Sequence, residues 1–231
     1  MPRVVNASDW AFYERHFAER RLRHYVSECG GDRSRAMLLY DWNTEISAAF
    51  WESLAYLEVA LRNALDNRMT QMHAAKGRPG HWIFDDAREL GRDGRGPNRH
   101  KYPYEDIATA IRRVRTNRQP VDPGQIISEI SFGFWHQMVS SRQRFLWPDL
   151  VAAFPGSPDR RQSTVHDPIA GLRAFRSRIG HHHRIWSLDI PARYADLLTV
   201  AGCLDVDLPG WIDTRSRVPA VLSARGGSRA G

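Results

Sequence analysis

The chain has 231 residues, of which 42% are hydrophobic and 10% aromatic, so it can bury a substantial core and is not a chain too polar to fold. No stretch approaches the apolar length of a membrane helix, no signal peptide is evident, and Cys29 and Cys203 lack metal or redox spacing. The net charge of +7, carried almost wholly by arginine, suits a polyanionic partner, although a G+C-rich genome would also give many arginines. We expect a cytoplasmic protein that contacts no membrane.

Two helices are predicted before residue 77. Ser8 or Asp9 can cap the first, and Gly30-Gly31 ends it. The second covers about residues 34–73 without Gly or Pro. Its apolar residues recur at spacings of three and four, as in a helix that faces a core: Met37, Leu38, Ile46, Phe50, Leu54, Leu57, Leu61, Leu65 and Met69.

Residues 77–103 are rich in Gly, Pro, Arg and Asp and predict a long variable surface loop, with a short apolar anchor at residues 82–84. A basic helix is expected over about residues 104–118. The loop from Arg92 to Lys101 and this helix are plausible RNA-contacting surfaces, and a solvated basic face explains them equally well.

Further helices are expected to the end of the chain. Pro123 can begin one, whose apolar spacing places five residues inward: Ile126, Ile127, Ile130, Phe134 and Met138. Residues 142–154 form a shorter one, and Pro168 can occupy the first turn of the next. Residues 191–204 predict a closing helix, and residues 209–218 a short one that Pro219 stops. Alternation of period two is absent, so we predict an all-α domain over residues 1–222 and a disordered tail over 223–231.

Three adjacent histidines, His181 to His183, lie in a segment predicted to be helical. Since a helix rotates by roughly 100° per residue, three neighbours cannot all face a core. A metal site is disfavoured because adjacent side chains diverge, whereas helical zinc ligands normally sit four residues apart. We therefore predict no metal and no cofactor. A structural position at a helix C-terminus remains open for His182 and for His183.

Metal-independent RNA cleavage is the remaining interpretation. In that reaction the ribose 2′-hydroxyl attacks the neighbouring phosphate, which requires a group of near-neutral pKa and a fixed cation. Arg176 and His181 supply these two functions. Five residues apart on a straight helix, they diverge by roughly 140°. A single copy holds them loosely unless Gly180 ends or bends the helix, and two copies in a dimer would surround a phosphate more completely.

The same residues resemble a known family. Arg176 and His181 fit the Arg-x4–6-His motif of HEPN domains, and Phe175-Arg-Ser-Arg-Ile-Gly-His-His with Arg184-Ile-Trp186 is similar to the C-terminal motif of Abi-like (abortive infection) proteins. Tyr56-Leu-Glu-Val-Ala-Leu-Arg-Asn-Ala-Leu65 looks like their N-terminal helix. Ile130-Ser-Phe-Gly-Phe-Trp135, with Leu146-Trp147 and Phe154-Pro155, looks like their middle segment. The resemblance covers roughly residues 35–210.

The resemblance implies an all-α, HEPN-like helical bundle, here with an inserted long loop and extra helices. It also implies a homodimeric, metal-independent endoribonuclease of phage defence or of a toxin–antitoxin system, with RNA and a possible antitoxin as partners. Arg176 and His181 would be catalytic, with Ser177 and His182 in support. Ser177 stands where the family commonly has Asn, which favours the alternative of a non-catalytic RNA-binding or partner-binding module.

Several other residues are expected to position the site or contact RNA: Arg62, Asn63, Arg178, His183 and Arg184. Arg62 also lies four residues after Glu58, a spacing that suits an ordinary ion pair within a helix. DNA binding by a helix-turn-helix ranks last, because no compact helix pair with a short Gly turn fits that motif.

Overall fold

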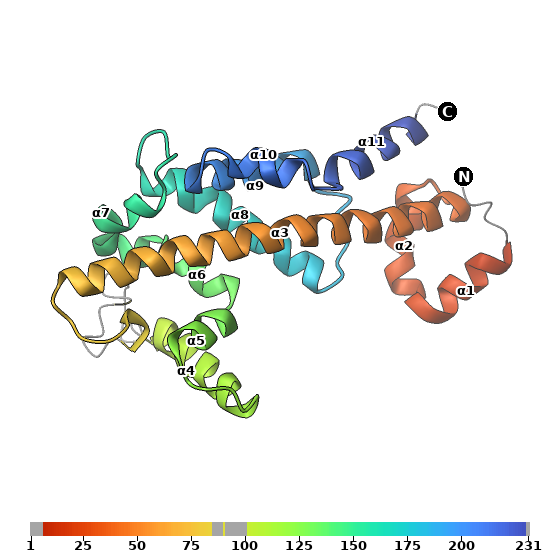
Figure 1. Ribbon diagram of the computed structural model, residues 1–231. Coiled ribbons are helices and arrows are strands. Elements are labelled where there is room, and N and C mark those ends of the chain that lie inside the picture. Colours follow the sequence, from red (N-terminus) through yellow and green to blue (C-terminus); the bar gives the residue numbers. More distant parts are fainter. Residues whose placement is uncertain (1–6, 85–89, 91–100, 230–231) are drawn as a thin grey trace. The chain divides into compact units, whose positions relative to one another are not determined.

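The structure is a computed structural model that describes residues 7–84, 90 and 101–229 (Figure 1). Within these residues every regular element is helical, which confirms the prediction of an all-α fold. Most of the predicted loop 77–103, including its arginines from Arg92, lies outside the described residues. None of the described helices is long and apolar enough to cross a membrane.

The chain divides into two compact units. Unit 1 comprises residues 1–52, 178–189 and 216–231, and unit 2 comprises residues 53–177 and 190–215. The 43-residue helix α3 (Arg33–Ala75) contributes to both, as does α8 (Gln162–Gly180). The uninterrupted α3 agrees with its predicted range, because no Gly or Pro occurs in it.

Unit 1 has an aromatic core. It packs α1 (Ala7–Phe17) and α2 (Glu19–Glu28) against the first part of α3. Its buried residues are Trp10, Leu22, Tyr25, Ala36 and Met37, with Trp186 packed on them. The single helix predicted before Gly30 is wrong, because Ala18 adopts a φ of 58° and separates α1 from α2. This break lets Phe17 stack on Tyr40 with ring centroids 5.0 Å apart.

The C-terminal helix α11 (Val218–Arg229) belongs to unit 1. The Trp42 indole donates to the Val221 carbonyl at 3.0 Å, and the Arg225 guanidinium lies 4.3 Å from the Trp42 ring centroid. Two expectations differ here. Pro219 stands near the start of a helix and does not end one, and the predicted tail is helical as far as residue 229. Within the predicted tail, Arg225 makes the contact with Trp42, and residues 230–231 lie outside the described part.

Unit 2 contains the remaining elements. They are η1 (Trp82–Phe84), α4 (Lys101–Thr116), α5 (Pro123–Glu129), α6 (Phe132–Met138), η2 (Ser141–Leu146), α7 (Trp147–Leu150), η3 (Val151–Ala153), α9 (Ile190–Leu204) and α10 (Leu208–Asp213). Helices α4 and α5, both green in Figure 1, lie side by side. The largest side chains of this core are fully buried: Trp82, Phe134, Trp135, Phe154 and Phe175.

Two predicted boundaries in unit 2 are corrected. The helix expected from Pro123 divides at Ile130, whose ψ of 132° is extended, although its predicted inward residues are all buried. Pro168 lies inside α8 and not in its first turn, because the helix already begins at Gln162. A proline there lacks the N–H that would bond to the preceding turn, and the flanking Val165 and Ile169, both 0% exposed, hold the helix by packing.

Candidate functional site

The three histidines follow the end of α8 and do not lie within it. The N–H of His182 donates to the Ile179 carbonyl and that of His183 to the Arg178 carbonyl, both at 2.8 Å. These bonds form a Schellman motif, which closes the helix after Gly180 and places His182 at a φ of 53°. The prediction of helical histidines is wrong for this reason. All three imidazoles are exposed, and those of His181 and His183 lie 5.9 Å apart between centroids.

Polar contacts within unit 1 hold the histidine turn, residues 181–186, in place. The buried Asn43 side-chain oxygen accepts from the N–H groups of Ile185 and Trp186 at 2.8 and 3.2 Å. Arg21 donates to the His182 carbonyl, and Arg178 Nη2 donates to the Arg184 carbonyl at 2.8 Å. Side chains from α2, α3 and α8 thus fix the backbone while the imidazoles remain accessible.

Arg176 lies in unit 2, where Glu58 of α3 binds it. Its Nε donates to Glu58 Oε2 at 3.0 Å, with side-chain exposures of 33% and 21%. Its guanidinium also lies 5.9 Å from the Phe132 ring centroid. The partner of Glu58 is therefore Arg176 and not Arg62, the neighbour that the helical spacing favoured. A half-buried ion pair of this kind orients the guanidinium.

The other predicted residues of unit 2 have different surroundings. Ser177 and Asn63 are exposed, while Arg62 is half-buried and its Nε lacks a hydrogen-bond partner in the described part of the chain. Arg176 belongs to unit 2 and His181 to unit 1, so the pairing of these two residues stays a prediction.

The predicted residues Arg178, His183 and Arg184 do meet in one place, a basic cavity of about 510 Å³ in unit 1. Residues of α2 complete the cationic wall, which consists of Arg20, Arg21, His24, Arg178, His183 and Arg184. The pKa of His24 is lowered from its ordinary value, first by desolvation and then by the charges of Arg184, Arg23 and Arg20. The electrostatic environment of the cavity is therefore one of excess positive charge.

A second histidine cluster lies in unit 2. The rings of His136 on α6 and His166 on α8 are 5.2 Å apart between centroids, and His166 Nδ1 is 2.9 Å from Asp167 Oδ1. Burial, then His166, then Arg173 lower the pKa of His136 to about 4. His136 is thus neutral at physiological pH.

A carboxyl group of α4 is also perturbed. Asp106 accepts from Gln137 at 3.2 Å, and burial raises the pKa of the Asp106 carboxyl group.

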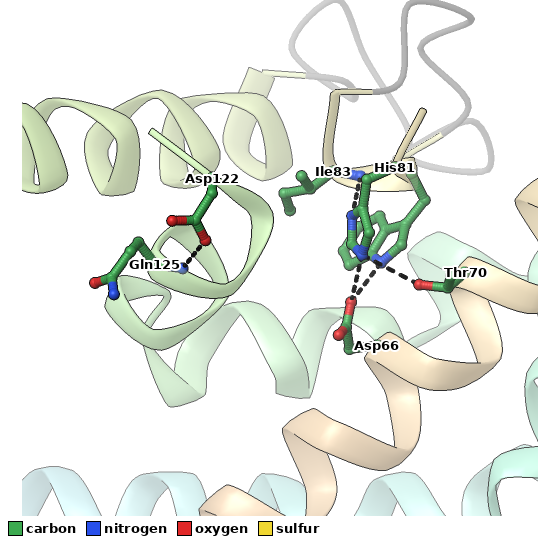
Figure 2. A network of polar contacts seen from close by, with 7 residues as sticks. Asp66, Thr70, His81, Ile83, Asp122 and Gln125 are labelled. Carbon is green, nitrogen blue, oxygen red and sulfur yellow. Dashed lines mark hydrogen bonds and ion pairs between the residues drawn. The ribbon is translucent and has the colours of Figure 1, made fainter. Parts of the chain in front are cut away.

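A third polar network joins η1 to α3 (Figure 2). His81 Nε2 lies 3.2 Å from Thr70 Oγ1 and 3.5 Å from Asp66 Oδ1, and Nδ1 accepts from the Ile83 N–H at 3.3 Å. In a catalytic triad the hydroxyl and carboxylate bind opposite nitrogens of the imidazole. Here they share one nitrogen, so the network lacks the geometry of a triad. Together with the bond from Trp82 Nε1 to Asp66 at 2.7 Å, it fastens η1 to the helix.

Sequence reasoning overlooked Glu58 as a partner of Arg176 and the contribution of α2 to the basic cavity. Arg20, Arg21 and His24 do carry a weak signal, since spacings of three and four place basic side chains on one helix face. Nothing in the sequence marks Glu58 as the residue that contacts α8, because its spacing to Arg62 offered a nearer partner. His136 and His166 are 30 residues apart and gave no signal.

Comparisons with family models, curated proteins and solved structures found no match to this chain. Among the described residues, no group of three or more His, Cys, Asp or Glu side chains is arranged to hold a metal ion. The assignment of function therefore depends on the chemistry of the side chains and on the resemblance described above.

Proposed function

We propose that the protein is a metal-independent endoribonuclease of the HEPN type, acting in phage defence or in a toxin–antitoxin system. The observation that carries this proposal is the exposure of three imidazoles on a turn whose neighbouring arginines form a cationic wall. Imidazole moves protons near neutral pH, and guanidinium binds the phosphate of RNA. The resemblance to Abi-like proteins adds the expectation that these groups act on RNA.

We assign the proton transfer to His181 and the stabilisation of charge to Arg176. In the reaction the 2′-hydroxyl gives its proton to a base, its oxygen bonds to phosphorus, and the bond from phosphorus to the 5′-oxygen breaks. The departing 5′-oxygen takes up a proton. The products are a 2′,3′-cyclic phosphate and a 5′-hydroxyl. Arg176 compensates the negative charge that develops on the phosphate oxygens, and Ser177 and His182 assist.

Cleavage of RNA by purified protein in EDTA tests this function. We expect His181→Ala and Arg176→Ala each to reduce the rate by about 10²- to 10⁴-fold, as for the loss of a general acid–base or a charge-stabilising group. His16→Ala, which removes an exposed histidine of α1, is the matched control and should leave the rate unchanged. Equal rates for the wild type and the first two variants would refute catalysis by this site.

A non-catalytic RNA-binding or partner-binding module is the second candidate. It is favoured by Ser177, which is exposed where the family commonly has Asn, and by Glu58, which offsets the charge of Arg176. This candidate predicts RNA affinity that falls steeply with salt, without turnover of any RNA tested. If expression of the protein is toxic and His181→Ala relieves the toxicity, the result would instead support the nuclease. Light scattering of the purified protein would test the inferred homodimer.

A further inference from the structure

The basic cavity of unit 1 has a composition that favours a ligand with more than one negative charge. Four guanidinium groups and two imidazoles face it, from Arg20, Arg21, His24, Arg178, His183 and Arg184. No Asp or Glu is among the described residues that line it, so these charges have no counter-ion within the cavity wall. The volume of about 510 Å³ falls in the range of small-molecule sites.

Two of the guanidinium groups are already fixed in place. Arg21 donates to the His182 carbonyl and Arg178 to the Arg184 carbonyl, so neither must lose much freedom on binding. The Nε atoms of both arginines are buried and have no hydrogen-bond partner within the described structure. Buried donors without partners are rare in proteins and indicate a missing ligand or water.

The start of α2 adds to the positive potential. Ala18 precedes the helix and lines the cavity together with Arg20 and Arg21 of the first turn. Alanine has no side chain that can cap the free N–H groups, and no side-chain cap is present. Phosphate groups commonly bind where such N–H groups and the helix dipole point outward. Here this contribution adds to that of the four guanidinium groups, and the Glu19 carboxylate of the same turn offsets part of it.

We infer that this cavity binds a terminal phosphate group, carried either by the 5′ end of an RNA or by a free nucleotide. A phosphomonoester carries a charge of about −1.5 to −2 at pH 7 and has three strong acceptor oxygens, which suit several guanidinium donors. An internal phosphodiester carries only one negative charge and can accept hydrogen bonds from fewer of these guanidinium donors. The inference does not depend on RNA cleavage, since binding requires neither Arg176 nor proton transfer by His181.

Fluorescence anisotropy tests the site with two labelled ten-nucleotide RNAs of one sequence, one bearing a 5′-phosphate and the other a 5′-hydroxyl. The measurements use the full-length His181→Ala protein, so that the RNA stays intact. We expect the phosphorylated RNA to bind about tenfold more tightly, as for one added set of charge-assisted hydrogen bonds. Adenosine monophosphate should compete with it, and adenosine should not.

Three variants locate the binding site. Arg20→Gln and Arg184→Gln should each weaken binding of the phosphorylated RNA about tenfold. Arg23→Gln is the matched control, because Arg23 is an exposed arginine of α2 that does not line the cavity, and its affinity should remain within about twofold. Circular dichroism confirms that each variant is folded.

The two sources of the phosphate give different results, and both support the site. Tighter binding of phosphorylated RNA than of adenosine monophosphate identifies an RNA end, whereas equal binding identifies a nucleotide. Equal affinity for the two RNAs without competition by the nucleotide, or equal losses for Arg23→Gln and Arg20→Gln, would overturn the inference. Failure of RNA cleavage would leave these binding results unchanged.

Discussion

His182 occupies a backbone position that glycine usually fills. Helices α2 and α3 end in the same hydrogen-bond pattern, and their corresponding residues are Gly30 and Gly77, with φ values of 62° and 66°. A side chain at such a φ costs about 1 kcal/mol because the Cβ crowds the backbone. The backbone is therefore strained at His182, whose imidazole is exposed between His181 and His183. Such strain is consistent with a role for this turn in binding or catalysis.

Replacement of His182 by glycine should therefore stabilise the protein by about 1 kcal/mol. Arg118→Gly is the control, because Arg118 ends α4 in the same way with a φ of 56° and is also exposed. Urea unfolding measures both changes. If His182 supports the site, only His182→Gly lowers RNA cleavage. A loss of stability in His182→Gly would show that its side chain makes a contact that outweighs the strain.

At the scale of elements, periodicity predicted most of the helices but not where the chain turns. The spacing of apolar residues gave α3 and the buried faces of α5 and α6, because a core-facing helix must repeat every three to four residues. It missed the break at Ala18, since alanine favours helix and the turn there depends on the stacking of Phe17 on Tyr40. The candidate site was predicted only where its residues adjoin in sequence, and contacts from α2 and α3 required the tertiary structure.

Gly156 shows how closely two elements of unit 2 approach. Its N–H donates to the Cys203 carbonyl of α9 at 3.0 Å, and a Cβ at this position would lie 2.0 Å from the Gly202 carbonyl oxygen. Since that oxygen belongs to the backbone, it cannot move aside as a flexible side chain would. The turn before α8 therefore packs directly on α9.

We predict that Gly156→Ala destabilises the protein by about 1–3 kcal/mol or more, as for other overpacked sites. Gly210→Ala is the matched control, because a Cβ at Gly210 of α10 meets nothing within 4 Å and alanine favours helix. That variant should gain as much as about 1 kcal/mol. Thermal unfolding followed by circular dichroism compares the two, and similar effects of both substitutions would contradict the close approach.

At the scale of the whole molecule, each unit has its own core and its own group of histidines. Those of unit 1 are exposed beside arginines, whereas His136 and His81 of unit 2 have lowered pKa values because burial disfavours their charged forms. Asp66 opposes the effect at His81. The histidines with lowered pKa values, which are His24 in unit 1 and His81 and His136 in unit 2, couple folding to pH below neutrality.

This coupling determines whether the free energy of unfolding rises or falls with pH. His136 has a pKa of about 4 in the folded protein and 6.5 as its ordinary value, so below pH 6.5 the unfolded chain binds a proton that the folded protein does not. The contribution of His136 to the free energy of unfolding is therefore fully present above pH 6.5 and is lost as the pH falls towards 4. We expect the urea midpoint to decrease from pH 7 to pH 5, and to decrease less in His136→Gln. An equal decrease in the two proteins would exclude His136 as the cause.

The absence of lysine from the described wall of the basic cavity has a chemical consequence. Guanidinium groups keep their proton throughout the physiological pH range and do not react with agents that acetylate amines. Attraction of anions to this surface is therefore insensitive to acylation and answers chiefly to ionic strength. Dicarbonyl reagents selective for arginine would remove that attraction, and a phosphate ligand seated among the guanidinium groups would protect them.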